Sequence, residues 1–320
     1  MRRILVVLPL LALLIGMPAW AMAQIAMPLG SALSPFPVSQ SPLNCITFGD
    51  LAGGMWGVFQ GASPNSGLYA NHINADGSYA QRFNAAARLI ASPNTSVNNV
   101  SAAPDGIGGM VVCWFGQSPR DPASPFIALR YVHISYEGTI DTPDTGIVVS
   151  TIATAAACTG DGAGGAYVAW EELRSTSNPD ICAQHFNSQG QPQWTPLNSA
   201  TGRNLSPVAG LQRLRAVQED GTGGAYVVWA DSRSTGTVPL YVGRLVTSGL
   251  ASAPWPSTGL RVTPAASGVR YVGSGRSATN GLYVAWRDVA SNALCMGQHV
   301  LDNATLAWAV NGPVLALAAP

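Results

Sequence analysis

The sequence predicts an all-β fold made of repeated, antiparallel, four-stranded units. A glycine-rich turn followed by an apolar strand recurs five times, and short β-branched and aromatic segments alternate with polar loops. No convincing helical periodicity follows residue 23. Charged residues make up only 10% of the chain, against 35 glycines and 23 prolines, which is the composition of a sheet protein with many short turns.

The recurring stretch is clearest as GDGAGGAYVAW at 160–170 and EDGTGGAYVVW at 219–229. PDGIGGMVVCW at 104–114 is a third copy, and GDLAGGMWGVF at 49–59 is a looser one. SATNGLYVAW at 277–286 is one residue shorter and lacks the Asp. The aromatic residues that end the five copies are Phe59, Trp114, Trp170, Trp229 and Trp286. Their spacing of 55 to 59 residues divides the chain after the N-terminus into five units.

Each unit holds four short strand segments separated by turn residues, so the predicted fold is a five-bladed β-propeller with four-stranded antiparallel blades. A blade packs between two neighbours, which explains why the strand at 166–170 is apolar on both faces. The expected units are 43–96, 97–152, 153–208, 209–265 and 266–320, within a single domain over 24–320. PLGSALS at 28–34 resembles the last strand of a unit. The N-terminal segment is therefore expected either to add to the closing blade or to displace its C-terminal strand.

An Asp opens the glycine-rich turn in four of the five units. Its side chain can accept backbone N–H bonds within the turn, while the glycines allow positive φ. One carboxylate per turn is too few for Ca²⁺, which takes six to eight oxygens. We expect a structural role for these residues and no metal site or cofactor. They are Asp50, Asp105, Asp161 and Asp220.

The histidines share one repeat position in the third strand of their units. They are His72, His133, His185 and His299, and unit four has Arg244 at this position. Neighbouring strands lie about 4.8 Å apart, so the third strand lies about 10 Å outside the inner one. Positions on different blades diverge from there and cannot share one metal ion. The pattern predicts a polar, hydrogen-bonding role.

The N-terminus has the layout of a secretory signal peptide over 1–23. Arg2 and Arg3 precede an apolar run at 4–15, and Ala-Met-Ala at 21–23 is a cleavage signal. The run is too short to span a membrane. We expect a secreted or periplasmic protein. A near-neutral chain with no basic cluster argues against nucleic acid or anionic membrane as partner.

The five cysteines are odd in number and show no disulfide framework. Buried thiols acting as small apolar residues are favoured over disulfides, which stay open as the alternative.

Three features together resemble the repeat of exported bacterial β-propeller proteins, most of which lack a known activity. They are the D-G-x-G-G-A-Y-V-A-W strand, the acidic and Arg-containing stretches at 171–174 and 231–233, and D-I-C-A-Q-H-F followed by G-x-x-x-W. The resemblance covers essentially the whole chain after residue 23. It implies the fold and implies no catalytic residues. Unit one departs from it with Phe59 in place of Trp, and unit five lacks the Asp.

Function is expected on the loops between the second and third strands, where the five units differ most. These loops carry the candidate binding residues for a carbohydrate or protein ligand. The alternative is solvated turns with weak local ion pairs. The candidates are Arg120, Asp121, Glu171, Glu172, Arg174, Asp231, Arg233, Arg287 and Asp288.

No catalytic motif occurs, and no acid lies mid-strand among apolar residues, where a raised pKa is expected. We therefore expect a non-catalytic binding or scaffold module. The alternative is a propeller of the glycoside hydrolase kind, with two or three acids from different blades within about 5 to 10 Å at the mouth of the central channel.

Overall fold

The structure is a computed structural model that describes residues 45–61, 67–84, 87–91, 97–116, 127–140, 146–173, 178–196, 201–233, 238–264, 268–289, 294–309 and 312–317. The expected signal peptide, 1–23, lies outside these ranges. The described residues form strands and turns without a helix, which confirms the all-β prediction. Accordingly, they include no apolar helix of bilayer-spanning length.

Strands that follow one another in sequence pair antiparallel, so the chain folds into five successive sheets, here called blades. Blade one contains β1 (Cys45–Gly49), β2 (Met55–Gly61), β3 (Gly67–Ile73) and β4 (Arg88–Ala91). Blade two contains β5 (Asn98–Pro104), β6 (Met110–Gly116), β7 (Ala128–Ile134) and β8 (Ile147–Ser150). Blade three contains β9 (Ala153–Gly160), β10 (Ala166–Glu172), β11 (Asp180–Phe186) and β12 (Arg203–Asn204).

The last two blades follow the same plan, and blade four divides its outer position between two short strands. Blade four contains β13 (Gln212–Glu219), β14 (Ala225–Asp231), β15 (Leu240–Val246), β16 (Gly249–Leu250) and β17 (Leu260–Arg261), the last two both paired with β15. Blade five contains β18 (Val269–Arg276), β19 (Leu282–Asp288), β20 (Leu294–Val300) and β21 (Val314–Leu317). Each blade lies within one of the repeat units expected from the sequence.

The recurring apolar strand is the second strand of each blade. In blade three, Tyr167 on β10 stands opposite Thr159 of β9 and His185 of β11. All seven residues of β10 are buried, because the strand is central in its own sheet and both faces of that sheet meet a neighbouring blade. Apolar residues on both faces are therefore required.

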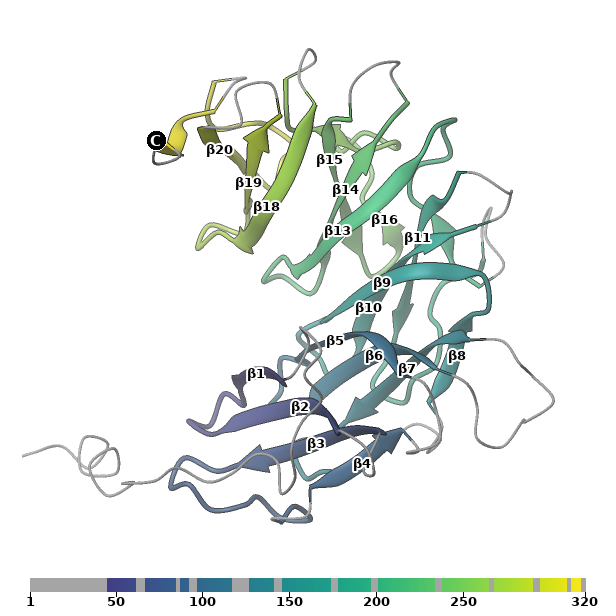
Figure 1. Ribbon diagram of the computed structural model, residues 1–320, viewed down its shortest axis with the longest axis vertical. Coiled ribbons are helices and arrows are strands. Elements are labelled where there is room, and N and C mark those ends of the chain that lie inside the picture. The colour runs from purple at the N-terminus through teal and green to yellow at the C-terminus, as the bar shows by residue number, and fades with distance from the viewer. Residues whose placement is uncertain are drawn as a thin grey trace, which may run out of the picture.

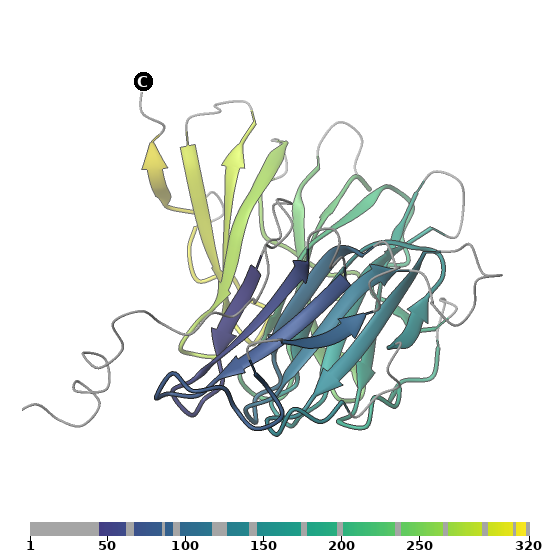
Figure 2. The same ribbon diagram turned by 60° about the horizontal axis from the view of Figure 1, so that its bottom comes forward.

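Four hydrophobic clusters join the blades in sequence, one at each junction from blade one to blade five. The blades stand side by side around a common axis, and blades one and five form the two ends of an open arc (Figure 1). The view in Figure 2 shows the same opening between them. The closed ring that the sequence predicts is thus not formed by the described residues, among which no cluster joins blade five to blade one.

In units two to five, a glycine in the last segment packs against the tryptophan of the second strand. A Cβ on Gly202 would lie 2.4 Å from the Trp170 ring, and one on Gly259 would lie 2.4 Å from the Trp229 ring. Both indoles are fully buried. The glycine recurs together with the Trp because the indole ring occupies the space that a side chain at the glycine position would need.

Replacing this glycine is expected to destabilise the fold. Gly202→Ala should lower the free energy of unfolding by about 1–3 kcal/mol, because the added methyl overlaps the Trp170 ring and the Ala183 carbonyl. Gly275→Ala is the matched control, since its Cβ would meet nothing within 4 Å. Urea denaturation followed by tryptophan fluorescence measures both. Equal stability of the two variants would contradict the packing argument.

Candidate functional site

Each Asp of the glycine-rich turn fastens the turn to the third strand of its own blade. In blade one, Asp50 Oδ1 accepts hydrogen bonds from the backbone N–H groups of Ala52 and Gly54, both at 2.8 Å. Its other oxygen, Oδ2, is hydrogen-bonded to His72 Nε2 at 2.8 Å, and both side chains are buried. We call this arrangement the clasp. The structural role expected for the Asp residues and the hydrogen-bonding role expected for the histidines are thus two sides of the same interaction.

The clasp recurs along the chain. The Asp105 and His133 side chains meet at 2.9 Å, and those of Asp161 and His185 at 2.8 Å. The last glycine of the turn makes room for it, since a Cβ on Gly165 would lie 2.4 Å from Asp161 Oδ2. The histidines of blades one to three therefore serve the scaffold of their own blades.

Units four and five vary the clasp. In blade four, Arg244 donates from Nε and Nη2 to Asp220 Oδ2, at 3.0 and 2.8 Å. In blade five, Ser277 takes the Asp position, and its hydroxyl is hydrogen-bonded to the backbone N–H of Thr279 at 3.2 Å and to the Thr279 hydroxyl at 2.9 Å. The buried Nε2 of His299 has no hydrogen-bond partner among the described residues. Blade five keeps the histidine and has lost its acceptor.

The contacts of the clasp lower the pKa of three turn carboxyls, those of Asp50, Asp161 and Asp220. Burial alone raises the pKa of the Asp50 and Asp161 carboxyls. Hydrogen bonds from the paired His and from two turn N–H groups outweigh burial, and both pKa values fall below the ordinary value. The pKa of Asp220 is lowered against burial in the same way, by the turn N–H groups and by Arg244.

Three carboxylates expected on variable loops belong to the strands of the scaffold. Glu171 and Glu172 end β10, and Asp231 ends β14. Glu172 and Asp231 are fully buried, and each accepts a hydrogen bond from the indole N–H of the Trp two residues earlier, at 2.9 and 3.1 Å. The loop boundaries drawn from the sequence were wrong here, because residues two apart on a strand share a face and the acid follows the buried Trp inward.

Glu171 and Arg233 join blade three to blade four. Glu171 accepts hydrogen bonds from Leu214 N and Arg213 Nη1, both at 2.8 Å. Arg233 Nη2 donates to Asp231, Ser206 and Thr258 at 2.6 to 2.9 Å. Its guanidinium carbon lies 3.9 Å from the centroid of the Tyr241 ring. These contacts hold both side chains within the scaffold.

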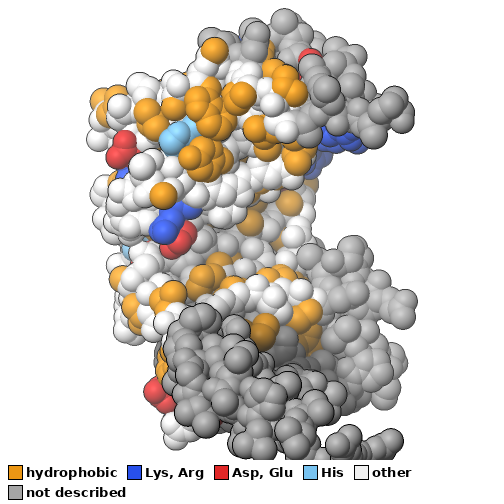
Figure 3. Space-filling model, turned by 90° about the vertical axis from the view of Figure 1, so that its left-hand side faces the viewer, with side chains coloured by type: hydrophobic (Ala, Val, Ile, Leu, Met, Phe, Trp, Pro, Cys, Tyr) orange, Lys and Arg blue, Asp and Glu red, His pale blue; other side chains and the backbone are white. Residues whose placement is uncertain are grey.

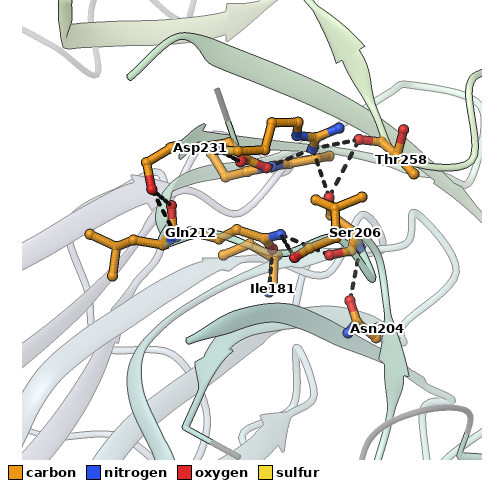
Figure 4. Close-up of polar contacts among 11 residues, drawn as sticks. Ile181, Asn204, Ser206, Gln212, Asp231 and Thr258 are labelled. Carbon is orange, nitrogen blue, oxygen red and sulfur yellow. Dashed lines mark hydrogen bonds and ion pairs between the residues drawn. The ribbon is translucent and has the colours of Figure 1, made fainter. Parts of the chain in front are cut away.

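Gln212 completes this junction. Its amide accepts from Ile181 N at 3.0 Å and donates to the Ser206 carbonyl at 2.8 Å. Figure 4 shows Gln212 directed toward Ile181 and Ser206 of blade three, with Asp231 and Thr258 beside them.

The other loop candidates divide in two. Arg287 and Asp288 are half-buried at the end of β19. Arg120, Asp121 and Arg174 lie outside the described residues.

A cavity on the axis brings all five blades together, and the sequence did not indicate it. About 550 Å³ in volume, it is lined by the first strand of every blade, with Arg215, Glu219 and Tyr271 contributing functional groups. A second cavity of about 510 Å³ lies among the glycine-rich turns and includes Asp161 and Arg276. Glu219 lines both. We call the two together the axial cavity.

The axial cavity combines an aromatic ring with charged groups. Glu219 and Arg276 form an ion pair at 3.1 Å, with both side chains nearly half exposed. Tyr271 Oη is hydrogen-bonded to Ser274 Oγ at 2.8 Å. Burial raises the pKa of the Tyr271 phenol, although the Ser274 bond and the nearby Arg215 charge act in the opposite direction. The phenol is therefore neutral and can both donate and accept.

Two acids line the axial cavity, Asp161 and Glu219, from blades three and four. Asp161 uses both oxygens in its clasp. Within the described ranges, these two are the acids of the cavity lining, and Glu219 pairs with Arg276 instead of with a glycine-rich turn. The same ranges contain no group of three His, Cys, Asp or Glu side chains that could hold a metal ion.

The cysteines are free thiols in the structure. Cys113, Cys158 and Cys182 are buried, as the favoured interpretation predicts, whereas Cys45 is exposed and Cys295 is half-buried. A hydrogen bond with Cys158, together with burial, raises the pKa of the Cys113 thiol. The three buried cysteines pack in the cluster between blades two and three.

No protein-family model and no curated protein matches the chain. Several solved structures are similar to it at low identity. An ulvan lyase, a polysaccharide lyase, is 10% identical with a TM-score of 0.47, over 86% of this chain and 72% of that one. The six-bladed fucose-recognising lectin of Aleuria aurantia is 12% identical with a TM-score of 0.42, over 85% and 78%.

Two further structures extend this range. An endo-arabinase from Bacteroides thetaiotaomicron is 12% identical with a TM-score of 0.34, over 80% of this chain and 92% of that one. A neuraminidase-like protein of A/little yellow-shouldered bat/Guatemala is 11% identical with a TM-score of 0.44. That match covers 66% of this chain and only 58% of the other protein's length.

These comparisons correct the expectation that the chain is not an enzyme. Polysaccharide lyases and an endo-arabinase are among the similar structures, so the architecture is no ground for excluding catalysis. At such low identity and TM-scores, the comparisons assign neither a reaction nor a ligand.

Restoring the clasp in blade five is expected to stabilise the protein. Ser277→Asp should place an acceptor beside the unpartnered His299 Nε2 and raise the free energy of unfolding by about 1 kcal/mol. The same substitution in a His299→Phe background is the control, because it retains the turn contacts without the His partner. Urea unfolding curves measure the gain. An equal gain in both backgrounds would exclude the clasp as its source.

Acid is expected to release the clasps. The pKa values of Asp50, Asp161 and Asp220 are lower in the folded chain than the ordinary value of an Asp carboxyl. Their contribution to stability is therefore complete above about pH 4 and is lost as the pH falls through the folded values. Unfolding free energies, measured from neutral pH down into the acid range, should fall most steeply below about pH 4.

Asp161→Asn should make this acid limb shallower, and Asp302→Asn, in an exposed hairpin turn, controls for the loss of a carboxylate as such. An unchanged acid limb in Asp161→Asn would contradict the assignment.

Proposed function

We propose that the protein binds an acidic saccharide in the axial cavity. The observation that carries this proposal is a concave site on the axis of the arc, lined by the inner strands of all five blades and equipped with Arg215, Tyr271 and the Glu219–Arg276 pair. The part of the site that the first strands line has a volume of about 550 Å³, which lies in the range of small-ligand sites, about 300–1,000 Å³. Strand-borne side chains hold such a site rigidly.

The chemistry of the lining suits a sugar ring. A saccharide has apolar C–H faces and a rim of hydroxyl groups. The Tyr271 ring offers an apolar face and a neutral hydroxyl, while the Glu219 carboxylate accepts from sugar hydroxyls. Arg215 is exposed in the cavity, and none of the described residues forms an ion pair with it. Its planar guanidinium matches a uronate carboxylate or a sulfate, so a negatively charged sugar is favoured.

This proposal moves the binding site from the variable loops to the axis. The loop candidates that the structure describes are held in scaffold contacts or half-buried at strand ends, whereas Arg215 and Tyr271 face open space. A protein ligand on the loop face has no comparable support among the described residues. We also propose that the expected signal peptide exports the chain, so that the site meets extracellular or periplasmic glycans.

The test is saccharide binding by isothermal titration, with neutral and acidic oligosaccharides. Arg215→Gln should weaken binding of an acidic oligosaccharide about 10- to 100-fold, the effect of losing a charge-assisted hydrogen bond of about 1.5–3 kcal/mol. Arg270→Gln is the matched control, because Arg270 is an exposed residue of β18 that lies beside Tyr271 in the chain and is not part of the cavity lining.

Circular dichroism confirms that both variants fold. Failure to bind any acidic oligosaccharide, or equal affinity of the Arg215→Gln variant, would overturn the proposal. Analysis of the same mixtures for cleavage products determines whether a bound saccharide is also degraded.

A further inference from the structure

Two aromatic side chains attach blade three to blade four. Tyr167, on the second strand, donates its hydroxyl to the Gly223 carbonyl in the next glycine-rich turn, at 2.8 Å. Trp194, in the segment after the third strand, donates its indole N–H to the Thr247 carbonyl in the next hairpin, at 2.7 Å. Both rings pack into the cluster between the two blades.

Blade four repeats both contacts on blade five. The Tyr226 hydroxyl donates to the Asn280 carbonyl, and Trp255 Nε1 donates to the Asp302 carbonyl at 2.7 Å. The interface between blades therefore uses two aromatic donors on one blade and two backbone carbonyls on the next.

Blade five carries the same two aromatics at its open face. Tyr283 and Trp308 occupy the repeat positions of Tyr167 and Trp194, yet they are 43% and 37% exposed. With His299 they form a preformed cluster, with ring centroids 4.4 Å apart for Tyr283–His299 and 5.9 Å for Tyr283–Trp308. The corresponding separations in blade three are 4.5 and 5.8 Å. The donor half of an interface is thus in place without its partner.

Gln298 holds Trp308 in this arrangement. Its Oε1 accepts from Trp308 N at 3.1 Å, and its Nε2 donates to the Trp308 carbonyl at 3.3 Å. Gln184 makes the same pair of contacts with Trp194, at 3.0 Å each. The exposed face of blade five is therefore built like the covered ones.

Apolar side chains surround the two aromatics. Val272, Val314 and Leu315 are each about half exposed. A cavity of about 260 Å³ lies against Trp308 and Leu315, between glycines of β18 and β20. Figure 3 shows apolar side chains gathered on this side of the molecule. Exposed apolar patches of this kind mark interaction surfaces.

The outer edge of blade five is occupied by its own strand. β21 pairs antiparallel with β20, with Leu294 opposite Leu317. Of the two alternatives expected for the N-terminal segment, displacement of the C-terminal strand is not found in this structure, because that strand is present. The uncovered part of blade five is the face that points away from blade four and carries Tyr283 and Trp308.

We propose that residues 24–44 dock across the open face of blade five and cover Tyr283, Trp308 and Leu315. This stretch, QIAMPLGSALSPFPVSQSPLN, contains no charged residue, so burying it on an apolar face costs no ion desolvation. It continues directly into β1, the innermost strand of blade one, at the other end of the arc. An extended chain of this length reaches about 70 Å, so the face is within reach.

The segment can supply what the next blade supplies elsewhere. Its backbone carbonyls accept from the Tyr283 hydroxyl and the Trp308 indole N–H, and its Leu29, Leu33 and Phe36 side chains cover the apolar patch. Prolines at 28, 35, 37 and 42 favour an extended backbone and remove N–H donors that an apolar face could not satisfy.

Site-specific photo-crosslinking in the full chain tests this docking. The photoreactive residue p-benzoylphenylalanine replaces Leu315, and the crosslinked peptides are identified by mass spectrometry. The expected product joins position 315 to a peptide within 24–44 of the same chain. The same probe in place of Val148, an exposed apolar residue on blade two, is the matched control and should not capture this segment.

A second variant tests the apolar nature of the contact. Leu33→Glu with Phe36→Glu should lower the crosslink yield at least about tenfold, because both carboxylates would be desolvated on docking. A crosslink from position 315 to blade one of the same chain would show ring closure by direct blade contact and overturn the proposal. Crosslinks between chains, equal capture from position 148, or no crosslink at all would also overturn it.

Discussion

The clasp is the interaction on which blades one to four depend. One carboxylate oxygen gathers the N–H groups of a glycine-rich turn, and the other fastens the third strand, so a single buried charge fixes the first three strands of a blade together. The turn also presents carbonyls such as that of Gly223 to the preceding blade. The geometry of the junction between blades therefore follows from the geometry of the clasp within each blade, and a buried carboxylate with all its partners satisfied is a rigid anchor.

The repeat made much of this fold predictable. The recurrence of the turn, the doubly apolar second strand and the polar third-strand position each report a local constraint that every unit must satisfy. The pairing of Asp161 with His185 was less accessible, because 24 residues separate them and only the sheet register brings them together. The difference between units could have indicated this pairing. Arg244 takes the place of the histidine opposite Asp220, and both Arg and His side chains can donate a hydrogen bond to the carboxylate.

The site was harder to predict than the scaffold. Glu172 and Asp231 looked like loop residues because acids are usually exposed. Residues two apart on a strand lie on the same face, however, so each acid lies beside the Trp two residues earlier. The axial cavity is formed by first strands from five units, and no local pattern in Arg215 or Tyr271 shows that these strands converge. Closure of the ring depends on the angle between successive blades, which side-chain packing determines at each junction.

Unit five departs from the repeat in two ways that bear on each other. It has lost the turn Asp, and its outer face meets no following blade in the described structure. The Tyr283 ring packs on His299, the residue left without its carboxylate. In blades three and four, the equivalent aromatics are held from one side by the clasp and from the other by the next blade. In blade five, both supports are absent while the donors and rings keep their positions. A chain that violates its own repeat at one blade, and exposes the repeated half of an interface there, has the features of a surface kept for another contact.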